Sequence, residues 1–248
     1  MSGDGGTPTK VWDWVVPADG ERFGSDIFDA EVRRRWCAAV FTGGLPYLWH
    51  EVAAIPRRML LDRLEVTVGD RVLVIGEATE AIGFDEDVRR LVGPTGEVVV
   101  VDIRDRVLSG LMTGGGVQWH WDMTDGYEDD QFDCVFVAQA VAHAADWTAT
   151  GRDLLRVLKP GCRLVLGEIS FSSTFLTRAR ADVHLEYWLR KLVEGMGETL
   201  EILVHWDLEQ LVSALEPQLI GLETFEWRGV ELLWGSKPGP DDVGDSSS

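Results

Sequence analysis

The sequence predicts an α/β protein with a doubly wound, mainly parallel sheet of seven strands, of which the last is antiparallel. Short apolar runs such as 70–76 and 97–103 are typical of buried strands. Helical patterns separate most of these runs, and a helix is the usual connection between parallel strands. The final two runs, 221–229 and 230–237, have no helix between them and therefore predict an antiparallel pair.

The elements follow one another in a regular order. The amino-terminal part, 25–64, has a mainly helical pattern, and Pro56 is well placed in the first turn of a helix. The strands are predicted at 70–76, 97–103, 117–123, 132–139, 163–169, 221–229 and 230–237. Helices are predicted at 85–92, 107–112, 151–158, 174–195 and 207–216, and a turn at 159–162.

The chain length and composition predict one domain. A chain of 248 residues can bury one sizeable core, which we assign to 25–237. Residues 1–24 are expected to be flexible, and 238–248 to form a disordered acidic tail. No apolar run approaches the roughly 20 residues of a membrane span, and the amino terminus shows no signal pattern, so we expect a cytoplasmic protein. A homodimer is compatible with the sequence.

The charge and the metal-binding residue types exclude several classes of function. The formal net charge of -19 opposes contacts with phosphate backbones, so we expect a small-molecule substrate and no nucleic acid. Cys37, Cys134 and Cys162 are far apart in the chain and predict free thiols. The five histidines form no pair with the spacing of metal ligands, so no metal site is expected.

Three stretches resemble one enzyme family when taken in their order. They are "GPTGEVVVVDI", "DQFDCVFVAQAVAHAADW" and "LLRVLKPGCRLVLGE", which lie between residues 93 and 168. Together they resemble class I S-adenosylmethionine-dependent methyltransferases of the quinone and small-molecule branch. The resemblance implies a Rossmann-like fold, S-adenosylmethionine as cofactor, and a ligand crevice at the carboxyl ends of the strands. It also implies a helical substrate lid at 170–205.

The resemblance implies roles for residues that follow three strands. Asp102 would accept hydrogen bonds from the ribose hydroxyls, and Ile103 would flank the adenine. Asp122 would reach the exocyclic amine of adenine, and Met123 would lie against its ring. Ala138 begins the loop expected beside the methionine arm. The competing interpretations are a helix-capping role for Asp102 and a solvated loop position for Asp122.

The loop in "VLVIGEATEAIG" departs from the glycine-rich pattern of the family. Val74 stands where the family has an acid, Gly76 is kept, and Ala78 and Glu80 replace later glycines. Glycines permit close approach of the backbone to a ligand. We expect Gly76, Glu77 and Ala78 to line an adapted cofactor site, because the ribose and adenine positions remain. The alternative is a fold that has lost or repurposed this site.

Several side chains are candidates for chemistry and substrate binding. His143 follows a predicted strand and is the candidate catalytic base, although a single histidine is often structural. His184 and Tyr187 would share one face of a lid helix, and His50 lies near the amino-terminal helices. We expect these three to contact substrate, with simple packing as the alternative.

The tryptophan content points to the class of acceptor. The sequence contains 11 tryptophans, which can form aromatic walls against a flat substrate. We therefore expect methyl transfer to a small aromatic, polyketide-like or quinone-like acceptor. The alternatives are a methyltransferase-fold protein that catalyses another reaction or serves as a binding partner, and an NAD-dependent enzyme.

Overall fold

The computed structural model describes residues 49–50, 53–77, 79–106, 122–169, 208–227 and 230–242. The predicted flexible segment at 1–24, the predicted helix at 107–112 and the predicted lid at 170–205 lie outside the described residues. The domain boundaries assigned from the sequence therefore stay predictions. Within the tail predicted at 238–248, Gly239 and Asp242 close a turn.

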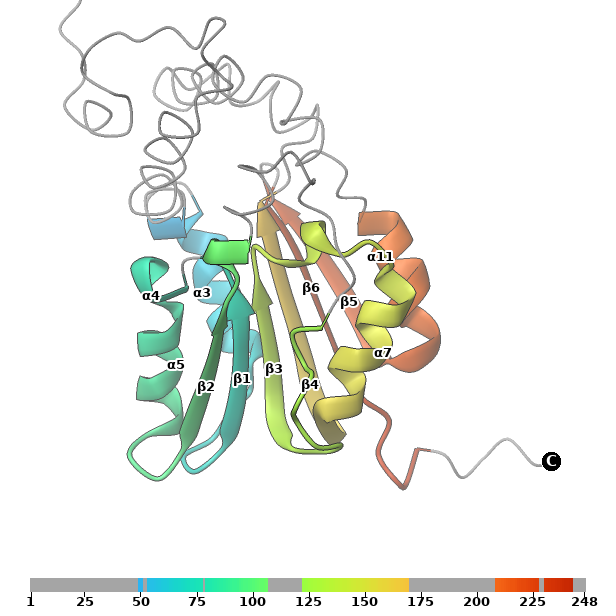
Figure 1. Cartoon of the computed structure of the whole chain (residues 1–248), viewed down its shortest axis with the longest axis horizontal. Coiled ribbons are helices and arrows are strands. Elements are labelled where there is room, and N and C mark those ends of the chain that lie inside the picture. The colour runs from blue at the N-terminus through green and yellow to red at the C-terminus, as the bar shows by residue number, and fades with distance from the viewer. Residues whose placement is uncertain are drawn as a thin grey trace, which may run out of the picture.

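A six-stranded sheet forms the centre of the described structure (Figure 1). Its strands are β1 (Arg71–Gly76), β2 (Glu97–Asp102), β3 (Phe132–Ala138), β4 (Leu158–Ile169), β5 (Ile220–Trp227) and β6 (Val230–Ser236). The order across the sheet is β2-β1-β3-β4-β6-β5. The first four strands are mutually parallel, whereas β6 pairs antiparallel with both β4 and β5.

The mainly parallel Rossmann-like sheet with an antiparallel last strand is confirmed. The strand count differs from the predicted seven, because most of the expected strand at 117–123 lies outside the described residues. Its last residue, Met123, instead begins a turn that runs to Gly126.

Helices pack on both faces of the sheet. They are α3 (Ala54–Arg63), α4 (Thr79–Ile82), α5 (Phe84–Val92), α7 (Trp147–Val157) and α11 (Leu208–Leu215), with short 3₁₀ turns η4 (Val141–His143) and η5 (Glu216–Gln218). In Figure 1, α7 and α11 lie in front of the sheet and α3 lies behind it. Helices on both faces explain why almost every residue of β1 and β3 is buried.

An aromatic cluster packs Trp49 and helix α5 against the sheet. Phe84 of α5 contacts Phe136 of β3 edge to face, with ring centroids 4.9 Å apart. The rings of Trp49 and Phe84 also meet edge to face, with their centroids 5.2 Å apart. Such pairs contribute about 0.5–1.5 kcal/mol each beyond the area they bury. The cluster fixes α5 against the central strands.

Two boundaries differ from the predicted ones. The helix predicted from residue 151 begins at Trp147, because the Asp146 carboxylate accepts a hydrogen bond from the N–H of Ala149 and caps the helix. The turn predicted at 159–162 lies within β4. There the Gly161 N–H donates to Lys237 O at 2.8 Å, so pairing with a distant segment extends the strand.

No helix in the described part of the chain is long and apolar enough to cross a membrane.

Candidate active site

Four residues form a row where the parallel strands end. Gly76 of β1 is in register with Asp102 of β2 on one side and with Ala138 of β3 on the other. Ala138 is in turn in register with Gly167 of β4. Parallel strands bring their carboxyl ends to the same edge of the sheet, and ligands bind at that edge in open α/β folds. The structure thus brings Gly76, Asp102 and Ala138 together at this edge of the sheet.

Gly76 is required by the neighbouring strand. A Cβ atom at this position would lie 2.1 Å from the carbonyl oxygen of Ala138 and 2.8 Å from the Thr79 side chain. No side chain fits there without moving the backbone of β3. The sequence suggested that Gly76 serves close approach to a ligand; the contacts with Ala138 already exclude every other residue.

A buried pair of polar side chains joins the loops after β1 and β3. Glu77 directly follows β1, and its Oε1 is hydrogen-bonded to Nε2 of His143 in η4. Only 11% of the Glu77 side chain and 3% of the His143 side chain are exposed. A carboxylate bound to one ring nitrogen fixes the orientation of an imidazole and stabilises its protonated form.

A second polar pair lies at the ends of β3 and β4. The Gln139 Nε2 group donates to Oε1 of Glu168 at 2.8 Å, and both residues are buried. Burial raises the pKa of Glu168 well above its ordinary value, and the nearby Glu77 adds to this effect. The backbone N–H groups of Ala140 and Val141 act in the opposite direction, because they favour the carboxylate. Glu168 therefore keeps its proton to a higher pH than an ordinary glutamate does.

Sequence reasoning missed Gln139 and Glu168 as site residues. Each is a polar residue directly after, or at the end of, an apolar strand segment. Their position at the carboxyl end of a strand could have identified them as candidates, since ligands bind at that end of the strands in this architecture.

Asp102 ends β2 and is held by its own loop. Its Oδ2 lies 2.7 Å from Nε of Arg104, and its Oδ1 accepts a hydrogen bond from the Arg104 N–H at 2.9 Å. One quarter of the Asp102 side chain is exposed. The next residue, Ile103, is almost fully buried. The carboxylate thus lies at the edge of the sheet with an arginine as its present partner.

Asp122 is also paired with an arginine of the loop after β2. Its two carboxylate oxygens each accept a hydrogen bond from the Arg106 guanidinium. The hydrogen bond from Arg106 raises the pKa of the arginine. Met123, which follows Asp122, is buried. Both acids expected to contact the adenosine are therefore paired with cations.

A buried arginine lies close to the altered loop. Arg57 of α3 donates to Asp87 of α5 at 2.5 Å and packs over the Phe84 ring, with 4.2 Å from the guanidinium carbon to the ring centroid. Its Nη1 atom is buried with no hydrogen-bond partner among the described residues. Burial lowers the pKa of Arg57 in spite of the contact with Asp87. Sequence reasoning missed this residue, because its partner is 30 positions away.

The other predicted substrate and loop residues are His50, Ala78, His184 and Tyr187, with Glu80 of the altered loop. His50 is exposed beside the buried Trp49. Glu80 is exposed in the first turn of α4. Ala78, His184 and Tyr187 lie outside the described residues. In the described ranges no cluster of three or more His, Cys, Asp or Glu side chains could hold a metal ion.

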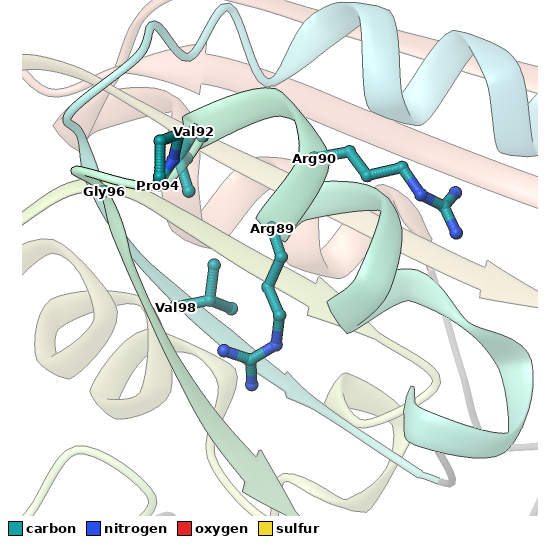
Figure 2. A pocket seen from close by; sticks show the side chains of 7 residues that line it. Arg89, Arg90, Val92, Pro94, Gly96 and Val98 are labelled. Carbon is teal, nitrogen blue, oxygen red and sulfur yellow. The ribbon is translucent and has the colours of Figure 1, made fainter.

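A surface hollow lies at the opposite edge of the sheet. It is lined by the end of α5 and the turn into β2, including Arg89, Pro94 and Val98 (Figure 2). Arg89 and Arg90 point in different directions in Figure 2, and each also pairs with an acid of α5. This hollow is remote from the carboxyl ends of the strands, so we do not assign the reaction to it.

Known proteins resemble this chain over most of its length. A family profile described as "Methyltransferase domain" matches residues 82–166, a match that begins where the altered loop ends. The chain is 34% identical over 193 residues to the ubiquinone/menaquinone biosynthesis C-methyltransferase UbiE of Pseudomonas putida, covering 71% of this chain and 72% of the relative. The protein of the same name from Pseudomonas aeruginosa has the same identity and coverage.

Among solved structures, a possible exported protein from Bordetella parapertussis has a TM-score of 0.50 and 18% identity, covering 76% of this chain and 68% of that chain. This likeness concerns the fold alone.

Together, the sheet order and the relatives define the class: the chain belongs to the class I S-adenosylmethionine-dependent methyltransferases. It is an enzyme of that class, and S-adenosylmethionine is its cofactor. Within the class, the relatives reported above carry the name of quinone-biosynthesis C-methyltransferases.

Proposed function

We propose that this methyltransferase methylates a ring carbon of a small, quinone-like aromatic acceptor. The observation that carries the proposal is the 34% identity, over 193 residues, to relatives named as ubiquinone/menaquinone biosynthesis C-methyltransferases. The buried Glu77 and His143 pair supports it, because methylation of an aromatic carbon requires a group that accepts the displaced ring proton.

The residues at the edge of the sheet fit an adenosyl ligand. In this proposal Asp102 accepts hydrogen bonds from the ribose hydroxyls and Asp122 accepts one from the adenine amine, with Ile103 and Met123 against the ring. Both carboxylates already accept hydrogen bonds from arginines, so they are oriented as acceptors.

The methionine arm would lie between the altered loop and Ala138. The buried Nη1 of Arg57 has no partner in the described ranges and fits the carboxylate of that arm. Gly76 and Glu77 would line the arm from the side of β1. The Glu77 carboxylate is hydrogen-bonded to His143.

The bound cofactor supplies an electrophilic methyl group on a sulfonium sulfur. The protein's part is to hold the acceptor in line with that group and to exclude water, since positioning provides much of the rate in such transfers. His143 would accept the proton that leaves the ring carbon, and Glu77 would hold the imidazole in its orientation.

A labelled-methyl assay tests the proposal. The purified enzyme is incubated with S-adenosylmethionine labelled in its methyl group and with a panel of hydroquinones, simple phenols and aliphatic hydroxy acids. We expect label on a ring carbon of a hydroquinone, identified by mass spectrometry and NMR of the product. Label on oxygen, or on an aliphatic acceptor only, would contradict the proposed acceptor class.

A matched control variant shows whether the labelled product depends on His143 or comes from a contaminating enzyme. Asp105 is the control position, because its side chain is exposed in the loop after β2. His205 is not used as a control, because it lies outside the described residues. Asp105→Asn should retain labelling, whereas His143→Asn should lose most of it. Equal labelling by both variants would remove His143 from the reaction.

A further inference from the structure

Two hydrogen-bonded pairs connect the ends of three neighbouring strands. Glu168 lies near the end of β4, Gln139 directly follows β3, and Glu77 directly follows β1. The Gln139 side chain donates to Glu168, and four positions later the imidazole of His143 is hydrogen-bonded to Glu77. The loop 139–143 therefore carries two buried polar pairs, one with the end of β4 and one with the loop after β1.

The loop 139–143 has a backbone that needs external support. Gln139 has a φ of 55°, in the left-handed region that residues with a Cβ seldom adopt. Its N–H donates to the Gly167 carbonyl at 2.9 Å, and its side chain donates to Glu168 at 2.8 Å. Such a conformation persists only where surrounding contacts determine it, and these two contacts come from the end of β4.

Glu168 is placed to hold the loop rather than to meet solvent. The residue is only 3% exposed, and its Oε2 has no hydrogen-bond partner in the described part of the chain. The N–H groups of Ala140 and Val141 lie close enough to favour its charged form. A buried acid costs free energy unless it is satisfied, and the hydrogen bond from Gln139 offsets part of that cost.

We propose that Glu168 is a positioning residue, which fixes the turn at Gln139 and thereby the orientation of the His143 imidazole against Glu77. It acts through the loop and does not itself exchange a proton with the acceptor. The functional significance rests on the proposed role of His143 as the base, but the positioning itself can be measured without cofactor or acceptor.

The proposal predicts that the turn at Gln139 depends on the acceptor oxygen of Glu168 and not on its charge. Gln139 needs an acceptor oxygen at this place, and a glutamine supplies one with nearly the same shape. Glu168→Gln should therefore keep the turn, whereas Glu168→Leu removes the acceptor and should release it. Gln139→Ala removes the donor and should release the turn from the other side.

The test observes His143 directly by NMR. The full chain is labelled with ¹⁵N-histidine, and ring ¹H–¹⁵N correlations are recorded at one fixed pH; the signals of His143 are those of the five histidines that disappear in His143→Gln. We expect the His143 signals to be the same in the wild type and Glu168→Gln, and to shift or broaden in Glu168→Leu and Gln139→Ala. Glu231→Gln is the matched control, because it changes the acid opposite Glu168 on β6 without removing the acceptor of Gln139.

The outcomes are decisive in each case. Unchanged His143 signals in folded Glu168→Leu would overturn the proposal, as would equal changes in Glu168→Gln and Glu168→Leu. If Glu168→Leu does not fold, the decision falls to Gln139→Ala, in which unchanged His143 signals would overturn it. Because no methyl transfer is measured, a failure of the labelled-methyl assay would count against the proposed function and leave this result standing.

Discussion

The imidazole of His143 is hydrogen-bonded through Nε2 to the carboxylate of Glu77, although the two residues are 66 positions apart in the chain. The contact exists because β1 and β3 are neighbours in the sheet, in register at Gly76 and Ala138. The loops that leave these strands therefore start side by side. The loop after β1 thus provides the carboxylate that contacts His143.

Replacement of His143 tests this contact in catalysis. A general base typically contributes 10²- to 10⁴-fold, so His143→Asn should lower kcat by about that range. Cofactor affinity should change little, because His143 is engaged with Glu77. Steady-state kinetics and calorimetry with S-adenosylhomocysteine measure the two effects. A fall in cofactor affinity with kcat intact would assign His143 to binding.

Replacement of Asp102 tests the ribose position. Loss of hydrogen bonds to a charged acceptor costs roughly 1.5–3 kcal/mol, so Asp102→Ala should weaken S-adenosylhomocysteine binding about tenfold to a hundredfold. The melting temperature should stay nearly the same, since the ion pair with Arg104 is partly exposed and such pairs contribute about 0–1 kcal/mol. Asp105→Ala, three positions along the same loop, is the control that should bind normally.

If Asp122 accepts a hydrogen bond from the adenine amine as proposed, Arg106 competes with the cofactor for it. The guanidinium holds both carboxylate oxygens, so binding of adenine requires this pair to share or release an acceptor. An exposed pair contributes about 0–1 kcal/mol, and its removal in Arg106→Gln should tighten S-adenosylhomocysteine binding by up to about fivefold. Weaker binding in calorimetry would show instead that Arg106 contacts the ligand.

The raised pKa of Glu168 predicts a pH dependence of stability. Burial, with the neighbouring carboxylates Glu77 and Glu231, raises its pKa in the folded protein above the unfolded value of about 4.3. As the pH rises above that value, the unfolded chain releases a proton that the folded protein retains, so unfolding becomes more favourable by up to about 1.4 kcal/mol per pH unit until the folded pKa is reached.

Glu168→Gln removes this penalty. The variant should gain stability relative to the wild type progressively as the pH rises above the unfolded pKa of about 4.3, as measured by urea unfolding over a range of pH. A difference between the two proteins that stays constant over this range would show that Glu168 has an ordinary pKa.

Much of the sheet was predictable because its strands are buried on both faces. The runs around Val74 in β1 and Phe136 in β3 are apolar over their whole length, which is the pattern of central parallel strands. The start of β4 was not predictable: Pro160 and Gly161 indicate a turn locally, and only pairing with Lys237 makes the segment part of a strand. Such pairing depends on residues distant in sequence.

The candidate site divides in the same way. The position of Asp102 follows from the end of an apolar run and the parallel register, both of which the sequence carries. The contact of Glu168 with Gln139 does not, because it depends on a left-handed backbone at a residue that is not glycine. The pairing of Arg104 with Asp102 and of Arg106 with Asp122 was likewise not predictable from the sequence.

The most direct test of the account is a calorimetric titration of the wild-type protein with S-adenosylhomocysteine, with NAD titrated in parallel. The account predicts saturable binding of S-adenosylhomocysteine in a one-to-one complex, loss of most of that affinity in Asp102→Ala, and no binding of NAD. Absence of binding to S-adenosylhomocysteine by the folded wild type, or binding that Asp102→Ala leaves unchanged, would contradict a cofactor site at the carboxyl ends of β1, β2 and β3.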